Sequence, residues 1–519
     1  MLAKRLSLAR KIVWATFLVS LPVSSFPYFP ASLGGGDASV RPLLVYPLLI
    51  LVLAVTFPSL WKKPLPRVWL PFFAFVTLAV ISSLLPFIRG TISHLKEVSV
   101  APRIIRSLIT LALAGAIYLT VSLVPRDKDE LRFTLQWFYA GLGVALFWGS
   151  LQIVYVLDII PNWFQIMRGM QHYISDSRLS PDRISGMAFE PSWFADQLAA
   201  LWLPWILGAV LTNYTVFKWR WRWLTVEKIL FLWMGGVLLF TLSRAGLGVA
   251  VAVIGAGVLF FRRKPERKRE SPARIKWLGQ IRETFSNLPD LAQRAITAGG
   301  ILLIIAALFL AVGTQSNYIS RMWAFSPFAE GKSLQKYFRY IGFGPRFIYW
   351  ETAYRVFTHY PLFGVGLGNF TFHFIDMMPS AHIGYMPELL RRFVPRVGRV
   401  ITSKNFFAHL LAETGFMGTA VFVTFLIMLA GGAFYLWRSN EKEERYWGTA
   451  ALIGIVAFLV DTFSYDSFAV PNPWIIFGLI TAAAKVFIRP REASEKERTS
   501  HLEFANKNLK SLTSSNSVN

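Results

Sequence analysis

The stretch VWLPFFAFVTLAVISSLLPFI, residues 68–88, decides the fold class, because it runs for 21 residues without a charged side chain. A helix that crosses a bilayer needs about 20 mainly apolar residues, since backbone amides in hydrocarbon must bond to one another. Similar runs recur along the whole chain, which is 54% hydrophobic and only 16% charged over 519 residues. The sequence therefore predicts an all-α, polytopic membrane protein rather than a soluble one.

Twelve such runs are expected to be transmembrane helices. They lie at about residues 12–30, 42–60, 68–88, 104–124, 132–157, 191–213, 225–243, 245–261, 296–315, 402–437, 446–463 and 471–488. Lys and Arg concentrate in cytoplasmic loops, and the basic N-terminus, alternate basic loops and basic tail place both termini in the cytoplasm. A cleaved signal must be considered for the first run, but no small-residue cleavage pattern follows it, which favours an uncleaved helix.

The domain organisation follows from these runs. Residues 1–488 are expected to form one transmembrane helical domain, with a large extracytoplasmic loop at 316–401 and a basic cytoplasmic loop at 262–295. Residues 489–519 have the composition of a disordered cytoplasmic tail. The net charge of +25 suggests anionic partners, and attraction of the cytoplasmic loops to membrane lipid explains it better than nucleic acid does. The chain has no cysteine, so disulfides are excluded.

The stretch PLFGVGLGNF, residues 361–370, places Gly364, Gly366 and Gly368 at alternating positions. A dinucleotide fingerprint requires G-x-G-x-x-G between a strand and a helix, which this stretch does not supply. We expect the glycines to let the backbone turn sharply after Pro361 and approach a neighbour or ligand closely.

The predicted outer loop is rich in arginine, against the positive-inside pattern. RRFVPRVGR, residues 391–399, holds Arg392, Arg396 and Arg399. Guanidinium groups suit bidentate pairing with phosphate oxygens, so this stretch indicates either an anion-binding surface or a solvated cluster near head groups. RFIYWETAYRVF, residues 346–357, predicts an amphipathic helix lying on the membrane, with Glu351 and Arg355 paired four residues apart. Packing of that helix on the bundle without a functional role is the alternative.

Three further stretches resemble the O-antigen ligase and O-antigen polymerase superfamily. LSRAG, residues 242–246, puts Arg244 in a minimal outer hairpin, and W-x(10)-P-L-F-G-V-G-L-G-N-F runs from Trp350 to the glycine stretch. SKNFFAHLLAETGFMG, residues 403–418, places Asn405 ten residues before Gly415. The motifs cover about residues 225–437, and the expected helix layout fits the superfamily too.

A fourth stretch narrows the resemblance. GMAFEPSWFADQ, residues 186–197, looks like the E-P-S signature of members that polymerise polysaccharide repeat units. The resemblance implies a GT-C-like membrane glycosyltransferase with no nucleotide sugar, metal or other cofactor. Such an enzyme transfers a glycan from undecaprenyl diphosphate to the next lipid-linked repeat unit, outside the bacterial inner membrane. A protein that regulates chain length is a further expected partner.

The chemistry suggests roles for the charged residues. A departing lipid diphosphate needs fixed cations where no metal is present, and Arg244 is the first candidate, although snorkelling to the interface is its alternative. Arg346 and Arg355 flank the interfacial helix but face opposite sides, so one of them is expected in a common site. Glu190 is the candidate base for the acceptor hydroxyl, in an extended pre-proline position, with helix capping as a compatible role.

One position departs from the ligase pattern. Ligase-type members usually carry histidine before the asparagine that matches Asn405, and here that residue is Lys404. His409 lies one turn further along and is either a substitute or a packed helix residue. Together with Asn369 and the three glycines, these residues are expected to shape the loop or contact substrate.

Three other functions remain open from the sequence. A ligase would pass the finished glycan to lipid A core or to protein, but Lys404 and the E-P-S stretch favour a polymerase. A flippase or exporter of lipid-linked oligosaccharide would need a charge-lined route, and the predicted helices show few internal charges. A membrane scaffold whose outer arginines bind anionic lipid is the third alternative.

Overall fold

The computed structural model describes residues 2–29, 40–62, 66–90, 99–176, 179–222, 224–261, 288–313, 344–379 and 401–488. These residues are almost entirely helical, with one two-stranded hairpin, β1 (Arg220–Trp221) and β2 (Leu224–Thr225). Among them, six helical segments are long and apolar enough to cross a membrane. The structure therefore supports an all-α membrane protein, while the expected number of twelve crossings stays a prediction.

All twelve expected runs overlap with helical segments, although the run expected at 12–30 is helical only up to Val19; η marks a π-helical stretch. The segments are α1 (Leu2–Val19), α2 (Val45–Leu51) with η2 (Val52–Thr56) and α3 (Phe57–Lys62), α4 (Trp69–Ile88), α5 (Val100–Leu123), α6 (Lys128–Val156), α8 (Pro191–Asp196) with η3 (Gln197–Trp202) and α9 (Leu203–Thr212), α10 (Val226–Phe240), α11 (Arg244–Ala256) with η4 (Gly257–Phe261), α13 (Asp290–Gly313), α19 (Phe406–Arg438), α20 (Lys442–Asp461) and α21 (Pro471–Phe487).

Among the described residues, three helices lie between the twelve expected runs. They are α7 (Trp163–Ile174), α16 (Gly344–His359) and α17 (Phe370–Met377). Of these, only α16 was predicted, as the amphipathic helix of residues 346–357. The long run at 402–437 is also not a straight helix, because Gly415 breaks α19 with a φ of 63° and a ψ of −165°.

The helices pack around one large core, which includes the buried indole rings of Trp202, Trp205, Trp447 and Trp474. Small residues allow close helix contacts in this core, as is usual in membrane bundles. A Cβ added at Gly208 of α9 would lie 2.8 Å from the Cβ of Ala450 on α20. A smaller core joins α16 and α17 to the start of α19 through residues such as Tyr349 and Phe374.

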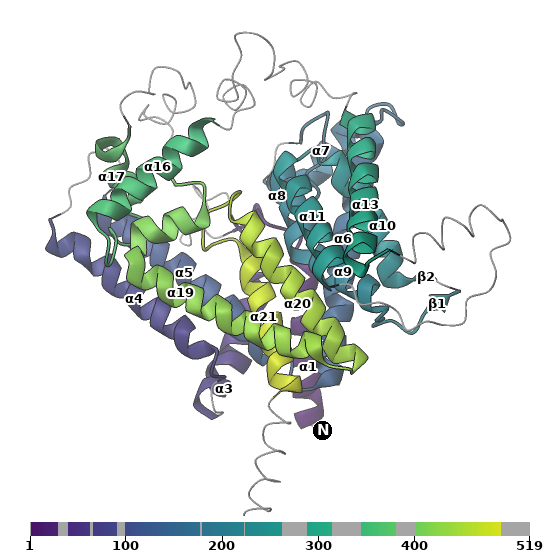
Figure 1. Ribbon diagram of the computed structural model, residues 1–519, viewed down its shortest axis with the longest axis horizontal. Helices are drawn as coiled ribbons and strands as arrows, with labels where there is room; N and C mark the ends of the chain where they lie inside the picture. Colours follow the sequence, from purple (N-terminus) through teal and green to yellow (C-terminus); the bar gives the residue numbers. More distant parts are fainter. Residues whose placement is uncertain are drawn as a thin grey trace, which may run out of the picture.

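The helix bundle has two ends, at which different elements lie. At one end, which we call the α16 end, α16 and α17 lie near the start of α19, while α7, α8 and α11 reach the same side of the molecule (Figure 1). The other end, which we call the N-terminal end, holds the start of α1, and ion pairs from Arg10 to Glu130 and from Arg132 to Glu443 bring the starts of α6 and α20 there. The predicted stretches 262–295 and 316–401 lie largely, and 489–519 entirely, outside the described residues.

Candidate functional site

The α20–α21 loop, residues 462–470, is the point at which the elements of the α16 end meet. The Phe406 N–H at the start of α19 donates to the Thr462 carbonyl at 3.0 Å. The Lys404 N–H donates to the Asp466 carboxylate at 2.6 Å, and Arg346 of α16 donates to the Phe463 carbonyl. Because this loop bonds to α16 and to α19, it holds both elements in a defined position.

A group of carboxylates lies beside this loop. The Ser464 hydroxyl is 3.2 Å from an oxygen of Asp196 on α8 and 3.2 Å from an oxygen of Asp461 on α20. Glu190 and Arg346 both act electrostatically on the Asp196 carboxylate. The second Asp196 oxygen is buried and has no hydrogen-bond partner within the described ranges. The site thus combines three acids and one guanidinium from α8, α16 and α20.

Glu190 stands at the entrance of α8 with its carboxylate exposed. Its backbone is extended, with a φ of −148° and a ψ of 163°, and Pro191 begins the helix. This confirms the extended conformation that the pre-proline position predicted. Glu190 occupies the N-cap position, but its side chain accepts a hydrogen bond from the Ser192 hydroxyl instead of from a helix N–H. The carboxylate therefore faces solvent at the α16 end.

Arg244 begins α11 after a three-residue turn, as the predicted minimal hairpin requires. The Ser243 hydroxyl caps the helix by accepting from the Gly246 N–H at 3.2 Å. A Cβ at Gly246 would lie 2.4 Å from the Cβ of Ala195, so α11 and α8 are in direct contact near their first turns. Arg244 consequently lies at the same end of the bundle as Glu190.

The two arginines of α16 have different surroundings. Arg346 reaches the α20–α21 loop, whereas Arg355 pairs with Glu351 at 2.6 Å and both of those side chains are about half exposed. The pair confirms the predicted contact four residues apart. The structure thus brings Arg346, and not Arg355, next to the carboxylates. Arg392, Arg396 and Arg399 lie outside the described residues.

The glycine stretch forms a tight loop against the break in α19. Gly364, Gly366 and Gly368 have φ values of 65°, 88° and 78°, which L-residues with a Cβ rarely adopt. The Gly366 N–H donates to the Glu413 carbonyl at 2.9 Å, and the Phe416 N–H donates back to the Pro361 carbonyl at 2.7 Å. The loop therefore occupies the backbone groups that the kink at Gly415 frees, and the sharp turn and close approach expected for the glycines are both present.

The Glu413 side chain holds this loop in place by accepting hydrogen bonds from its backbone. It is only 1% exposed and accepts from the Gly368 N–H at 2.7 Å, from the Phe370 N–H at 3.2 Å and from His409 Nε2 at 2.9 Å. Arg89 of α4 donates to the Gly364 carbonyl at 2.8 Å from another side. His409 is therefore tied to Glu413, and its Nδ1 is buried without a partner in the described part of the chain.

Asn369 and Asn405 both occupy N-cap positions but use their side chains differently. The Asn405 side chain accepts from the Ala408 N–H at 2.9 Å and starts α19. Asn369 precedes α17, is fully buried, and neither of its amide atoms finds a partner among the residues described. Lys404 adopts a left-handed backbone with a φ of 56°. These residues shape the segments on either side of the glycine loop.

A small cavity of about 100 Å³ lies between the glycine loop and the α20–α21 loop. Its charged and titratable lining residues are Arg103, Arg106, His409, Glu413 and Asp466. The nearby Tyr465 hydroxyl is buried, and burial, followed by the charges of Asp461 and Asp196, raises its pKa well above the usual value. Tyr465 therefore stays protonated and can donate a hydrogen bond but not act as a base.

Sequence reasoning missed several residues of this site. They are Arg103, Asp196, Glu413, Asp461 and Asp466. A charge inside an apolar run is costly and marks a functional or structural position, and this signal was present at Asp196, Glu413 and Asp461. The sequence predicted few charged residues inside the helices, but Glu413 and Asp461 are buried in the bundle. Within the described ranges, no three His, Asp or Glu side chains are placed to hold a metal ion.

A known protein family matches the segment that contains Arg244, Arg346 and the glycine loop. Residues 229–423 match the family model described as O-antigen ligase. This match supports the resemblance of the chain to the O-antigen ligase and polymerase superfamily. The matched O-antigen ligase segment contains Arg244, Arg346 and the glycine loop with its Glu413 anchor, whereas Glu190 and Asp461 come from outside it. No curated protein matches the sequence.

Proposed function

We propose that this protein is a member of the superfamily that polymerises undecaprenyl-diphosphate-linked repeat units into surface polysaccharide or O-antigen, on the outer side of the bacterial inner membrane. The observation that carries the proposal is that Asp196 and Arg346 bond to neighbouring residues of the α20–α21 loop, at the end of the bundle where Glu190 begins α8. An acid from the E-P-S stretch and a cation from the family segment, far apart in sequence, reach one end of the bundle. In this proposal, the α16 end faces the periplasm or exterior, and both termini are cytoplasmic.

The proposed reaction is a displacement at the anomeric carbon of the donor glycan. The acceptor hydroxyl oxygen forms a bond to that carbon, the bond from the carbon to the diphosphate oxygen breaks, and the hydroxyl proton passes to Glu190. Undecaprenyl diphosphate leaves with the electron pair, so negative charge develops on its oxygens. In the proposal, Arg346 and Arg244 stabilise this charge, which is the largest contribution expected in a site without metal.

The other candidate residues have supporting roles. His409, Glu413 and the glycine loop position the start of α19 and the α20–α21 loop, which in turn bonds to Arg346. Arg355 and the arginines at 392, 396 and 399 are proposed to attract the diphosphate at longer range. The proposed partners are the lipid-linked donor and acceptor, membrane lipid and a protein that regulates chain length. No nucleotide sugar or metal takes part in the proposed step.

Two alternative functions of the same site predict different results. A ligase would use the same cations to release undecaprenyl diphosphate but would pass the glycan to lipid A core or to protein. A flippase or exporter of lipid-linked oligosaccharide would leave glycan length unchanged when Glu190 or Arg244 is replaced.

The proposal is tested in cells that lack the protein and are complemented with wild type, Glu190→Gln or Arg244→Ala at matched expression. Gel analysis of lipid-linked and surface glycans is expected to show ladders for wild type and single repeat units on lipid for both variants. Glu441→Gln, at an exposed position of the N-terminal end, is the matched control and should give wild-type ladders. Full-length ladders from both site variants would refute the proposed site, and long lipid-linked chains that reach no acceptor would identify a ligase.

A further inference from the structure

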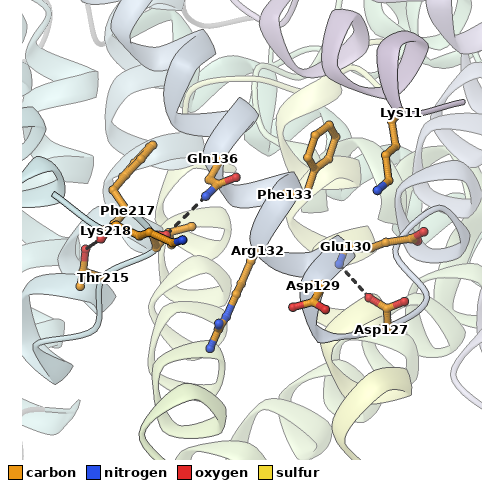
Figure 2. Close-up of a pocket in the computed structure, with 11 residues that line it drawn as sticks. Lys11, Asp127, Asp129, Glu130, Arg132, Phe133, Gln136, Thr215, Phe217 and Lys218 are labelled. Carbon is orange, nitrogen blue, oxygen red and sulfur yellow. Dashed lines mark hydrogen bonds between the residues drawn. The ribbon is translucent and has the colours of Figure 1, made fainter. Parts of the chain in front are cut away.

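A separate hollow of about 620 Å³ lies at the N-terminal end, on the far side of the bundle from the site above. Small-molecule sites usually have volumes of about 300–1,000 Å³. The hollow is lined by α1, by the first turns of α6 and by residues 215–218, which approach from three directions (Figure 2).

The walls of this hollow are held by side-chain contacts. Arg132 makes two hydrogen bonds to the Glu443 carboxylate, at 3.0 and 3.3 Å, and the Tyr214 hydroxyl donates to the same carboxylate at 2.8 Å. Gln136 donates to the Val216 carbonyl at 3.4 Å. These contacts connect α6, α20 and the 215–218 segment, so the hollow is a preformed feature of the fold.

The charges of the lining are balanced. Three cations (Lys11, Arg132 and Lys218) face three carboxylates (Asp127, Asp129 and Glu130). Several of these groups are already engaged, since Arg132 pairs with Glu443, Glu130 pairs with Arg10, and Asp127 caps α6 by accepting from the Glu130 N–H at 2.8 Å.

Three charged groups of the lining remain available. In the part of the chain that the structure describes, Lys11, Lys218 and Asp129 make no ion pair, and Lys11 instead lies 5.9 Å from the centre of the Phe133 ring. Two ammonium groups and one carboxylate around a preformed hollow suit a ligand that carries a phosphate beside a single cationic group.

The surroundings indicate that this ligand is a lipid. Leu8 and Ile12 flank Lys11 on α1 and are 59% and 58% exposed, and Trp219 follows Lys218 and is 50% exposed. Exposed apolar and Trp side chains beside lysines are typical of the head-group level of a membrane. A soluble phosphate compound would gain nothing from these exposed apolar side chains around the hollow.

We propose that the hollow binds the head group of a zwitterionic phospholipid with a primary ammonium, of the phosphatidylethanolamine type. Lys11 and Lys218, which lie on opposite sides of Arg132 and Phe133 in Figure 2, attract the phosphate, and the ammonium faces Asp129. The zero net charge of the lining favours this head group over an anionic one such as phosphatidylglycerol. A quaternary ammonium has no N–H to donate to Asp129, which disfavours phosphatidylcholine. This inference does not depend on the proposed enzyme activity.

The test is native mass spectrometry of the full-length protein in detergent, titrated with these three phospholipids carrying identical acyl chains. We expect wild type to retain phosphatidylethanolamine about tenfold more strongly than phosphatidylcholine, which corresponds to one charge-assisted contact. The Lys11→Gln, Lys218→Gln double variant should lose most of the bound lipid, and Asp129→Asn should lose the preference for phosphatidylethanolamine over the other two. Lys128→Gln is the matched control, because Lys128 lies over the Phe487 ring outside the hollow.

The wild-type comparison decides the proposal even where a variant fails to fold. Equal retention of the three lipids, or stronger retention of phosphatidylglycerol, would contradict a zwitterionic site. Retention that is unchanged in the folded double variant would place the lipid elsewhere. Displacement of the lipid by soluble glycerophosphoethanolamine at equal concentration would show that the head group alone binds and would contradict a lipid as the ligand.

Discussion

Replacing Arg346 with alanine is expected to slow glycan transfer by about 100- to 1,000-fold, the usual cost of removing one charge-stabilising donor from an active site. Arg346 bonds to the α20–α21 loop beside the carboxylates around Asp196, so the variant removes positive charge at the point where the diphosphate is proposed to leave. The measurement is the initial rate of product formation by purified protein in lipid vesicles, at saturating substrate.

Matched variants separate the charge of Arg346 from its position. Arg126→Ala, at an exposed position of the N-terminal end, should leave the rate near that of wild type. Arg355→Ala should lower the rate much less than Arg346→Ala, because Arg355 pairs with Glu351 on an exposed face. Arg346→Lys keeps the charge and should recover part of the rate. A rate for Arg346→Ala within threefold of the Arg126→Ala rate would remove Arg346 from the proposed site.

Gly364→Ala is expected to destabilise the α16 end and abolish activity. A Cβ at this position would lie 2.5 Å from the backbone carbon of Glu413, and the φ of 65° is unfavourable for alanine. The left-handed conformation costs about 1–2 kcal/mol, and the overlap about 1–3 kcal/mol more, because the contacted atoms are backbone and cannot rotate away. Thermal unfolding in detergent, followed with the transfer rate, measures both effects.

A second glycine serves as the control for this prediction. Gly235 lies within α10, with no atom near an added Cβ, so Gly235→Ala should be neutral or slightly stabilising, by up to about 1 kcal/mol. If Gly364→Ala unfolds at the temperature of Gly235→Ala and keeps full activity, the glycine loop does not require its observed conformation.

Local patterns in the sequence were sufficient to predict the helices and the sharp turn of the glycine loop. An uncharged run such as residues 68–88 has few alternatives to a buried or membrane helix, and α4 occupies residues 69–88. The alternating glycines after Pro361 predicted a sharp turn, and the Glu351–Arg355 pair depended only on helical spacing. In each case, the pattern that predicted the feature lies within a few residues, although the contacts that hold the glycine loop against Glu413 and Phe416 come from α19.

The grouping of the carboxylates depended on a contact that no local pattern contains. Asp461 lies three residues before Ser464, but Asp196 reaches the same hydroxyl from α8, more than 200 residues away in sequence. Glu413 lies in the motif SKNFFAHLLAETGFMG, but its function as the anchor of the glycine loop follows only from the hydrogen bond that it accepts from the Gly368 N–H. Arg346 and Arg355 looked equivalent in sequence, and only the position of the α20–α21 loop distinguished them.

The central claim is that this protein extends lipid-linked glycans, and the most direct measurement is made on the purified protein alone. Single lipid-linked repeat units, extracted from cells that lack the protein, are incubated with wild type in vesicles, and the lipid-linked products are sized by mass spectrometry. We predict products of two and more units, without added nucleotide sugar or a second acceptor, and none with Glu190→Gln. Units that remain single until lipid A core or protein is added, and then appear on that acceptor, would contradict the claim and identify a ligase.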